Sequence, residues 1–262
     1  LIGMFILTGG VLWSNFRKHK VNVAESKRER DLKIISSSSV QSLILESAQD
    51  VSKVISKCND VYLGSINGLA RLNAEDLRTS KNEVSRLGKE IDKLRNELFY
   101  FIQELEEENV IASHFYISLI SILEDMAQSL EYITKASYKH VNNNHRQLKY
   151  SQIKELKETQ SDLEGLLSDV RFSFDINAFE AFATFADKKE ELFANIDAKI
   201  NQQVQRTRSK EEKSPKNTTL FFSLMVETKD LIVATINLIE HYHLHYDPTV
   251  APKKLGDEQK DK

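Results

Sequence analysis

The sequence predicts an all-α protein made of two tandem three-helix bundles, preceded by the end of a transmembrane helix. Apolar residues recur at steps of three and four over most of the 262 residues, as in helices that bury one face. The chain contains only 8 glycines and 3 prolines, which leaves few places where a helix is broken. A charged fraction of 29% is typical of amphipathic helices with one solvated face.

The N-terminal segment Leu1–Trp13 is apolar and uncharged, and a basic cluster, Arg17–Lys20, follows it closely. At 1.5 Å per residue this run spans roughly 20 Å, less than the roughly 30 Å of a bilayer core. A signal peptide carries its positive charges before the apolar run. We therefore predict that residues 1–16 are the C-terminal part of a transmembrane helix in contact with the lipid bilayer, and that residues 17–39 are a basic, polar juxtamembrane linker on the cytoplasmic side. The alternative is a short apolar helix packed on the domain.

Residues 40–145 are predicted to form the first three-helix bundle. Its helices are expected at about Val40–Leu69, from Asn73 to the acidic run Glu104–Glu108, and at about Ile111–His140. Serines 36–39 are suitable N-caps for the first helix. The three asparagines 142–144 end the third, because asparagine competes for backbone groups and tolerates left-handed geometry.

The second helix has the most regular apolar seam of the chain. Its members alternate steps of three and four: Val84, Leu87, Ile91, Leu94, Leu98, Phe101 and Leu105. Such a seam packs inside a bundle or against a second helix in a coiled coil.

Residues 146–247 are predicted to form the second bundle, and residues 248–262 a disordered tail. The helices are expected at about Gln147–Val170, after Asn177, and at about Thr218–Tyr246, with a loop at Arg206–Asn217. The apolar stripe of the middle helix is expected to contain Phe182, Ala186, Phe193, Ile196, Ile200 and Val204.

Short similarities between the halves indicate a duplication. Leu72-Asn73-Ala74 resembles Ile176-Asn177-Ala178, and Leu123-Glu124 resembles Val226-Glu227, at a common offset of roughly 103 residues. The repeated helix order supports two bundles packed into one six-helix domain.

The composition excludes several classes of function. With 36 Lys and Arg against 39 Asp and Glu, nucleic acid is not expected as a partner. The single cysteine, Cys58, excludes an internal disulfide framework. The chain has no glycine-rich phosphate loop, nucleophile elbow or kinase signature, so we expect neither an enzyme nor a bound cofactor.

Several segments resemble the PhoU-like proteins. They are Phe115-Tyr116, the run Leu123–Ile133, the segment His140–His145 and Glu227–Ile232. The chain looks like the cytoplasmic PhoU-like extension of bacterial inorganic phosphate transporters of the PiT family.

This resemblance implies a regulatory domain of an ion-coupled phosphate transporter in the bacterial inner membrane, with residues after about 17 in the cytoplasm. Its partner would be its own membrane transport domain, which would hold the transport residues. A homo-oligomer is compatible with the resemblance. The alternative is a membrane-anchored helical scaffold or signalling adaptor that acts through coiled-coil contacts.

The resemblance also implies a metal motif on the third and sixth helices, where Glu or Asp is followed four residues later by Asp. Here Glu124 is followed by Gln128, and Glu227 by Leu231. We therefore predict no high-affinity metal cluster. The candidate ligands, should a metal bind, are Glu124, Asp125, Glu227 and Asp230. Glu227 also lies on the apolar seam of its helix, so we expect it to be buried and to need a polar partner.

His241 and His245 are four residues apart, the spacing of a zinc-binding pair. No cysteine or His-Glu-x-x-His pattern accompanies them, so the signal for a metal site is weak. Cys58 lies on the apolar stripe of the first helix and is predicted to be a structural thiol.

Overall fold

The computed structural model describes residues 37–104 and 110–246 of the chain, and this part contains α-helices, one short 3₁₀ helix and no strand. The helices are α2 (Ser37–Arg71), α3 (Ala74–Glu104), α4 (Val110–Asn142), α5 (Tyr150–Asp175), η2 (Phe179–Ala181), α6 (Phe182–Arg208) and α7 (Pro215–Tyr246). None of the helices in this part is long and apolar enough to cross a bilayer. The predicted membrane helix (residues 1–16), most of the linker and the tail (248–262) lie outside the described residues.

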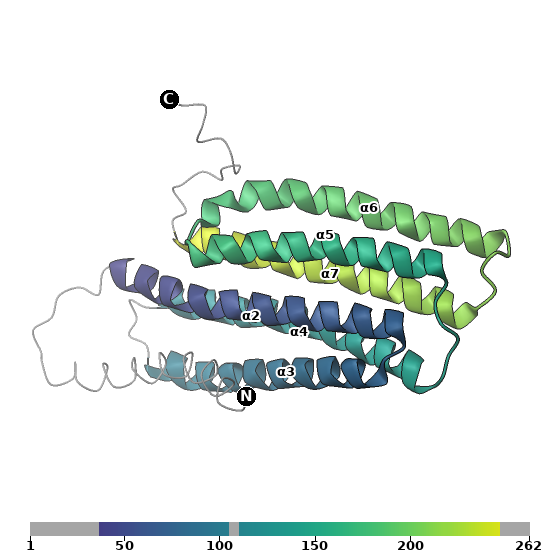
Figure 1. The fold of residues 1–262 in the computed structure, drawn as a ribbon. Coiled ribbons are helices and arrows are strands. Elements are labelled where there is room, and N and C mark those ends of the chain that lie inside the picture. The colour runs from purple at the N-terminus through teal and green to yellow at the C-terminus, as the bar shows by residue number, and fades with distance from the viewer. Residues whose placement is uncertain (1–36, 105–109, 247–262) are drawn as a thin grey trace, which may run out of the picture.

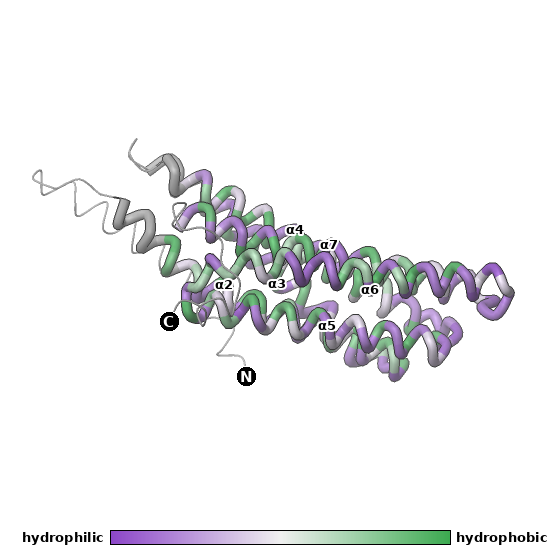
Figure 2. Tube along the Cα trace, turned by 90° about the horizontal axis from the view of Figure 1, so that it is seen from above, coloured by the Kyte–Doolittle hydropathy of each residue, from purple (hydrophilic) through white to green (hydrophobic). Residues whose placement is uncertain are grey.

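Two three-helix bundles lie side by side, as predicted (Figure 1). Helices α2, α3 and α4 form one bundle, and α5, α6 and α7 form the other. Across the interface α2 packs on α5 and α4 packs on α7, while α3 and α6 lie on opposite outer edges. The buried apolar side chains of both bundles form one continuous core. Apolar and polar residues alternate at short intervals along each helix (Figure 2), as expected for amphipathic helices.

The α3 seam is buried against α2 and α4. Its described members have exposed fractions of 9% or less: Val84, Leu87, Ile91, Leu94 and Leu98. The side chain of Phe101, and Leu105, lie outside the described residues. The seam is therefore used within the bundle and is not available to a coiled-coil partner.

The predicted α6 stripe is right only in part: Ile196 is buried, and Phe182, Phe193 and Ile200 pack against the core while partly buried. The side chains that α6 buries are Phe185, Leu192, Ile196 and the polar Gln203, whereas Val204 is 38% exposed. The first predicted members are only partly buried, because the buried face is displaced around the helix. The chain here offers alanines and polar residues on several faces, so the apolar periodicity is weak.

Two loops differ from their predicted positions. Helix α6 continues to Arg208 and α7 begins at Pro215, so the loop is 209–214 and not Arg206–Asn217. Proline at the first helical position costs nothing, because the amide it lacks has no partner within the helix there. Helix α5 also extends beyond Val170, to Asp175.

Left-handed residues end α2, α4 and α5. Leu72, Asn144 and Asn177 have φ angles of 55°, 53° and 58°. After Leu72 the amide of Asn73 donates to the carbonyl of Gly68 at 2.8 Å, and the bond that follows Asn177 has the same form.

The predicted alignment of the two halves is therefore displaced by one residue in this turn. Leu72 corresponds to Asn177, and Asn73 instead caps α3 by accepting from the amide of Glu75 at 3.0 Å. Likewise, Leu123 is buried whereas its proposed counterpart Val226 is 49% exposed. The duplication holds for helix order but not for these residue pairs.

Candidate functional site

The acidic position on α4 is already paired with an arginine. The Nη1 atom of Arg95 on α3 lies 2.7 Å from Oε1 of Glu124, and its Nη2 donates to Asp92. These residues and Gln128 line a shallow groove of about 320 Å³ between α3 and α4. Because Arg95 is permanently charged, Glu124 already has a cation beside it.

The acidic position on α7 lies at the interface between the bundles. Glu227 is only partly buried, less than expected, and it accepts a hydrogen bond from Ser129 on α4. Burial, and then the nearby charge of Asp230, raise the pKa of Glu227 above its usual value. Asp230 itself is exposed, as is Asp125 on α4.

These residues do not suit a high-affinity metal cluster. Glu124 is bound by a guanidinium, its helical neighbour Gln128 is a neutral ligand, and Glu227 accepts from a hydroxyl. A divalent cation usually takes several charged oxygen ligands. Across residues 37–104 and 110–246, no three His, Cys, Asp or Glu side chains lie where they could hold a metal ion. That the protein binds no metal stays a prediction.

The C-terminal histidines belong to an aromatic cluster between α4 and α7. Nε2 of His241 lies 2.9 Å from the carbonyl oxygen of Phe115, and the two rings stack with centroids 4.7 Å apart. The ring of His245 lies 4.3 Å from that of His241. Burial lowers the pKa of His241 to about 4, so the ring is neutral at pH 7.

Two buried hydrogen bonds between side-chain hydroxyls also join the bundles. The hydroxyl of Tyr62 on α2 lies 2.9 Å from that of Thr228 on α7, and the hydroxyl of Ser47 lies 2.7 Å from that of Tyr242. Cys58 on α2 is fully buried, which raises its pKa to about 12 and agrees with the predicted structural thiol.

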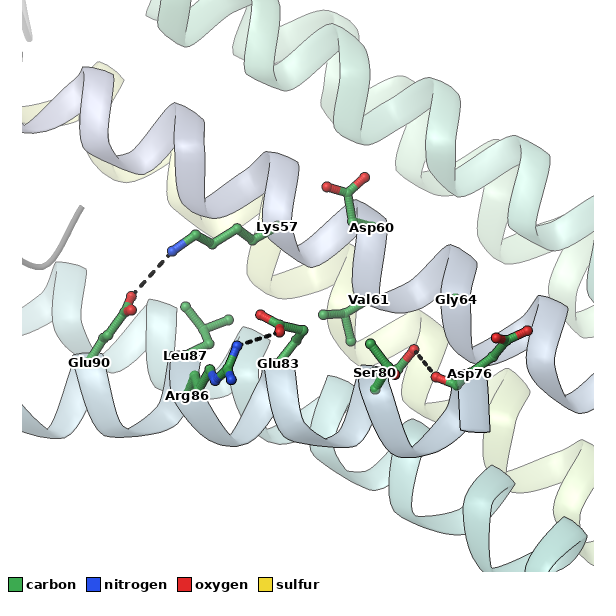
Figure 3. Close-up of a pocket in the computed structure, with 11 residues that line it drawn as sticks. Lys57, Asp60, Val61, Gly64, Asp76, Ser80, Glu83, Arg86, Leu87 and Glu90 are labelled. Carbon is green, nitrogen blue, oxygen red and sulfur yellow. Dashed lines mark hydrogen bonds and ion pairs between the residues drawn. The ribbon is translucent and has the colours of Figure 1, made fainter. Parts of the chain in front are cut away.

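A groove of about 440 Å³ lies between α2 and α3 (Figure 3). The helices touch at one end, where a Cβ on Gly64 would lie 2.5 Å from Oγ of Ser80. Toward Lys57 and Glu90 they diverge, and Val61 and Leu87 form an apolar floor. We call this cavity the α2/α3 groove.

Sequence reasoning missed Arg95, Ser129 and the α2/α3 groove. Arg95 follows Asp92 by three residues, a spacing that indicates an ion pair on one helix. Nothing in the sequence places Ser129 opposite Glu227, because that requires the packing of α4 on α7.

The described helices define an all-α protein of two three-helix bundles, and solved structures show the same architecture. PhoU from Pseudomonas aeruginosa superposes with a TM-score of 0.66 at 7% sequence identity, over 80% of this chain and 98% of that one. The phosphate transport system regulatory protein PhoU from Streptococcus pneumoniae superposes with a TM-score of 0.60 at 15% identity, over 80% and 96%. The chain therefore has a PhoU-like fold. No family model matches the sequence, and no curated protein does.

Proposed function

We propose that the chain regulates phosphate transport, as the cytoplasmic domain of an ion-coupled inorganic phosphate transporter in the bacterial inner membrane. The observation that carries the proposal is the fold, which matches nearly the whole length of two PhoU structures, one of them a phosphate transport system regulatory protein. The apolar run Leu1–Trp13 and the basic residues after it support attachment to a membrane.

The domain would act on the transporter from outside the permeation path. A path through a bilayer needs polar groups inside membrane segments, and the described helices are amphipathic bundle helices. A regulator instead binds one conformation of its partner more tightly than another. The joined bundles offer a rigid body for this purpose, because buried hydrogen bonds such as that of Tyr62 with Thr228 hold them together.

The scaffold alternative has lost its main support. It rested on the α3 seam as a coiled-coil surface, and residues such as Leu87 and Ile91 of that seam are buried within the first bundle.

Uptake of radiolabelled phosphate tests the proposal, in cells that lack other phosphate carriers. The full-length protein should move phosphate, and removal of residues 37–246 should change the rate or its regulation without abolishing uptake. A full-length protein that moves no phosphate contradicts the proposal and favours a scaffold.

A further inference from the structure

The α2/α3 groove has an apolar floor and a charged rim. Val61 and Leu87 lie between the two helices, and charged residues of α2 and α3 flank them; in Figure 3 the carboxylate of Asp60 is drawn on the side of α2 away from α3. The groove follows α3 from Asp76 to Glu90, which at 1.5 Å per residue is about 21 Å. A short extended peptide fits a channel of this length.

The rim has an excess of negative charge. Its four carboxylates are Asp60, Asp76, Glu83 and Glu90, and its two cations are Lys57 and Arg86, so its net charge is −2. Nζ of Lys57 lies 3.4 Å from Glu90, and Nη1 of Arg86 lies 2.7 Å from Glu83.

The surplus charge therefore resides on Asp60 and Asp76. Within the described part of the chain, neither has a lysine or arginine at ion-pair distance. This charge repels phosphate and attracts a cationic ligand.

Of the three segments outside the described residues, one has the complementary charge. Residues 17–36 contain seven Lys or Arg and three Asp or Glu, a net charge of +4. Residues 105–109 have a net charge of −3, and in residues 247–262 four basic and four acidic side chains cancel. We propose that residues 17–36, the part of the basic linker that precedes α2, dock in the α2/α3 groove of their own chain.

The linker is long enough to reach the groove. Asp60 lies 23 residues along α2 from Ser37, a distance of about 35 Å. An extended chain covers this distance in about 11 residues at roughly 3.4 Å each, so residues before about 26 reach the rim. The cluster Arg17–Lys20 and its neighbouring valines, Val21 and Val23, are within this range.

Tethering allows a weak contact to form. A short flexible linker holds its ends at an effective concentration on the order of millimolar, so a modest attraction populates the docked form. Because the attraction is between charges at the surface, it weakens when salt is added. Docking would hold the domain close to the point where the linker leaves the membrane. It is therefore a candidate means by which the proposed regulator changes its distance from its transporter.

Distances between two spin labels test the proposal in the full 262-residue chain, purified in a zwitterionic detergent. One label is placed on the linker by Ser26→Cys and the other on the groove rim by Thr79→Cys. Cys58 is fully buried, and labelling of the unsubstituted chain checks that it does not react. We expect a short-distance population at about 0.05 M salt that is lost at about 0.5 M.

Charge reversal identifies the groove as the binding site. Asp60→Lys takes the rim from −2 to 0, and adding Asp76→Asn takes it to +1; each should reduce the short-distance population, the double variant more. The matched control is Glu191→Lys, because Glu191 is an exposed carboxylate on α6 at the opposite edge. It changes the net charge of the chain as Asp60→Lys does and should leave the distances unchanged.

Three results would overturn the proposal. The first is a broad distribution without a short population at low salt, and the second is a short population that survives the double variant. The third is a short distance to a label on the tail, introduced by Gly256→Cys, in place of the linker. The measurement involves no phosphate, so its failure leaves the proposed function standing, and a failure of phosphate uptake leaves the docking result intact.

Discussion

His241 on α7 and Phe115 on α4 are joined twice, by stacked rings 4.7 Å apart and by a 2.9 Å hydrogen bond from the imidazole Nε2 to the Phe115 carbonyl oxygen. Phe115 is also in edge-to-face contact with Tyr242, whose hydroxyl bonds Ser47 on α2. One cluster therefore connects three helices from both bundles, and its central imidazole must stay neutral because it is buried.

Acid should weaken the fold through His241. Its pKa is about 4 in the folded protein against 6.5 for a free histidine, so between these values the unfolded chain binds a proton that the folded chain does not. The contribution of neutral His241 to the free energy of unfolding is therefore fully present above about pH 6.5. It is lost as the pH falls toward 4, by on the order of 1–3 kcal/mol. Urea unfolding across this range measures it. His241→Gln should flatten the slope, whereas the control His114→Gln, at an exposed position, should not.

The protein should contain substoichiometric iron, zinc and manganese when purified without chelator, because Arg95 supplies the cation beside Glu124. Elemental analysis of the purified chain measures this. Stoichiometric metal that disappears in the double variant Glu124→Ala/Glu227→Ala would show that the carboxylates bind metal after all.

Leu72→Gly should stabilise the protein. Leucine pays about 1–2 kcal/mol for its left-handed backbone, whereas glycine adopts it freely. Part of this gain is lost to the greater flexibility of glycine in the unfolded chain, so we expect a net gain of about 0.5–1 kcal/mol. Asn177→Gly in the equivalent turn should gain less, because asparagine tolerates this geometry. Chemical denaturation measures both variants. If Leu72→Gly stabilises the protein no more than Asn177→Gly does, the turn at Leu72 is not strained.

Arg206→Leu should destabilise the second bundle by about 3 kcal/mol, because it leaves the buried Glu155 charge without its partner. The two side chains form a bidentate pair, with distances of 2.7 and 2.6 Å. The control is Arg78→Leu, which breaks the exposed pair with Glu75 and should leave stability nearly unchanged. Urea unfolding measures both variants. Similar losses of stability in the two would contradict the claim that burial makes the Arg206 pair the more important one.

The helices were predictable where their apolar periodicity is strong. In α3 the apolar seam from Val84 to Leu98 packs inside its own bundle, so the helical spacing of these residues was enough to predict the buried face. In α6 this reasoning was right only in part, because ion pairs replace part of the apolar contact. Lys199 and Arg206 pair with carboxylates on α5, and a polar Gln203 occupies a buried position.

The candidate site was predictable only in part. The sequence shows directly that the acidic motif is incomplete, because Gln128 and Leu231 stand four residues after Glu124 and Glu227, where the motif has Asp. The partners Arg95 and Ser129 come from neighbouring helices, and which helices are neighbours depends on tertiary packing. The α2/α3 groove depends on how far two helices diverge beyond Gly64, a distance that no local pattern encodes.

The initial rate of radiolabelled phosphate uptake, measured after growth in scarce and in abundant phosphate, tests the central claim most directly. The comparison is between the full-length protein and a form that ends before Ser36, in cells without other phosphate carriers. If the domain is a regulator, both forms take up phosphate. The uptake rate of the full-length protein then depends on the phosphate supply during growth, and the rate of the truncated form does not. Equal rates and equal responses in both forms would contradict a regulatory role for this domain.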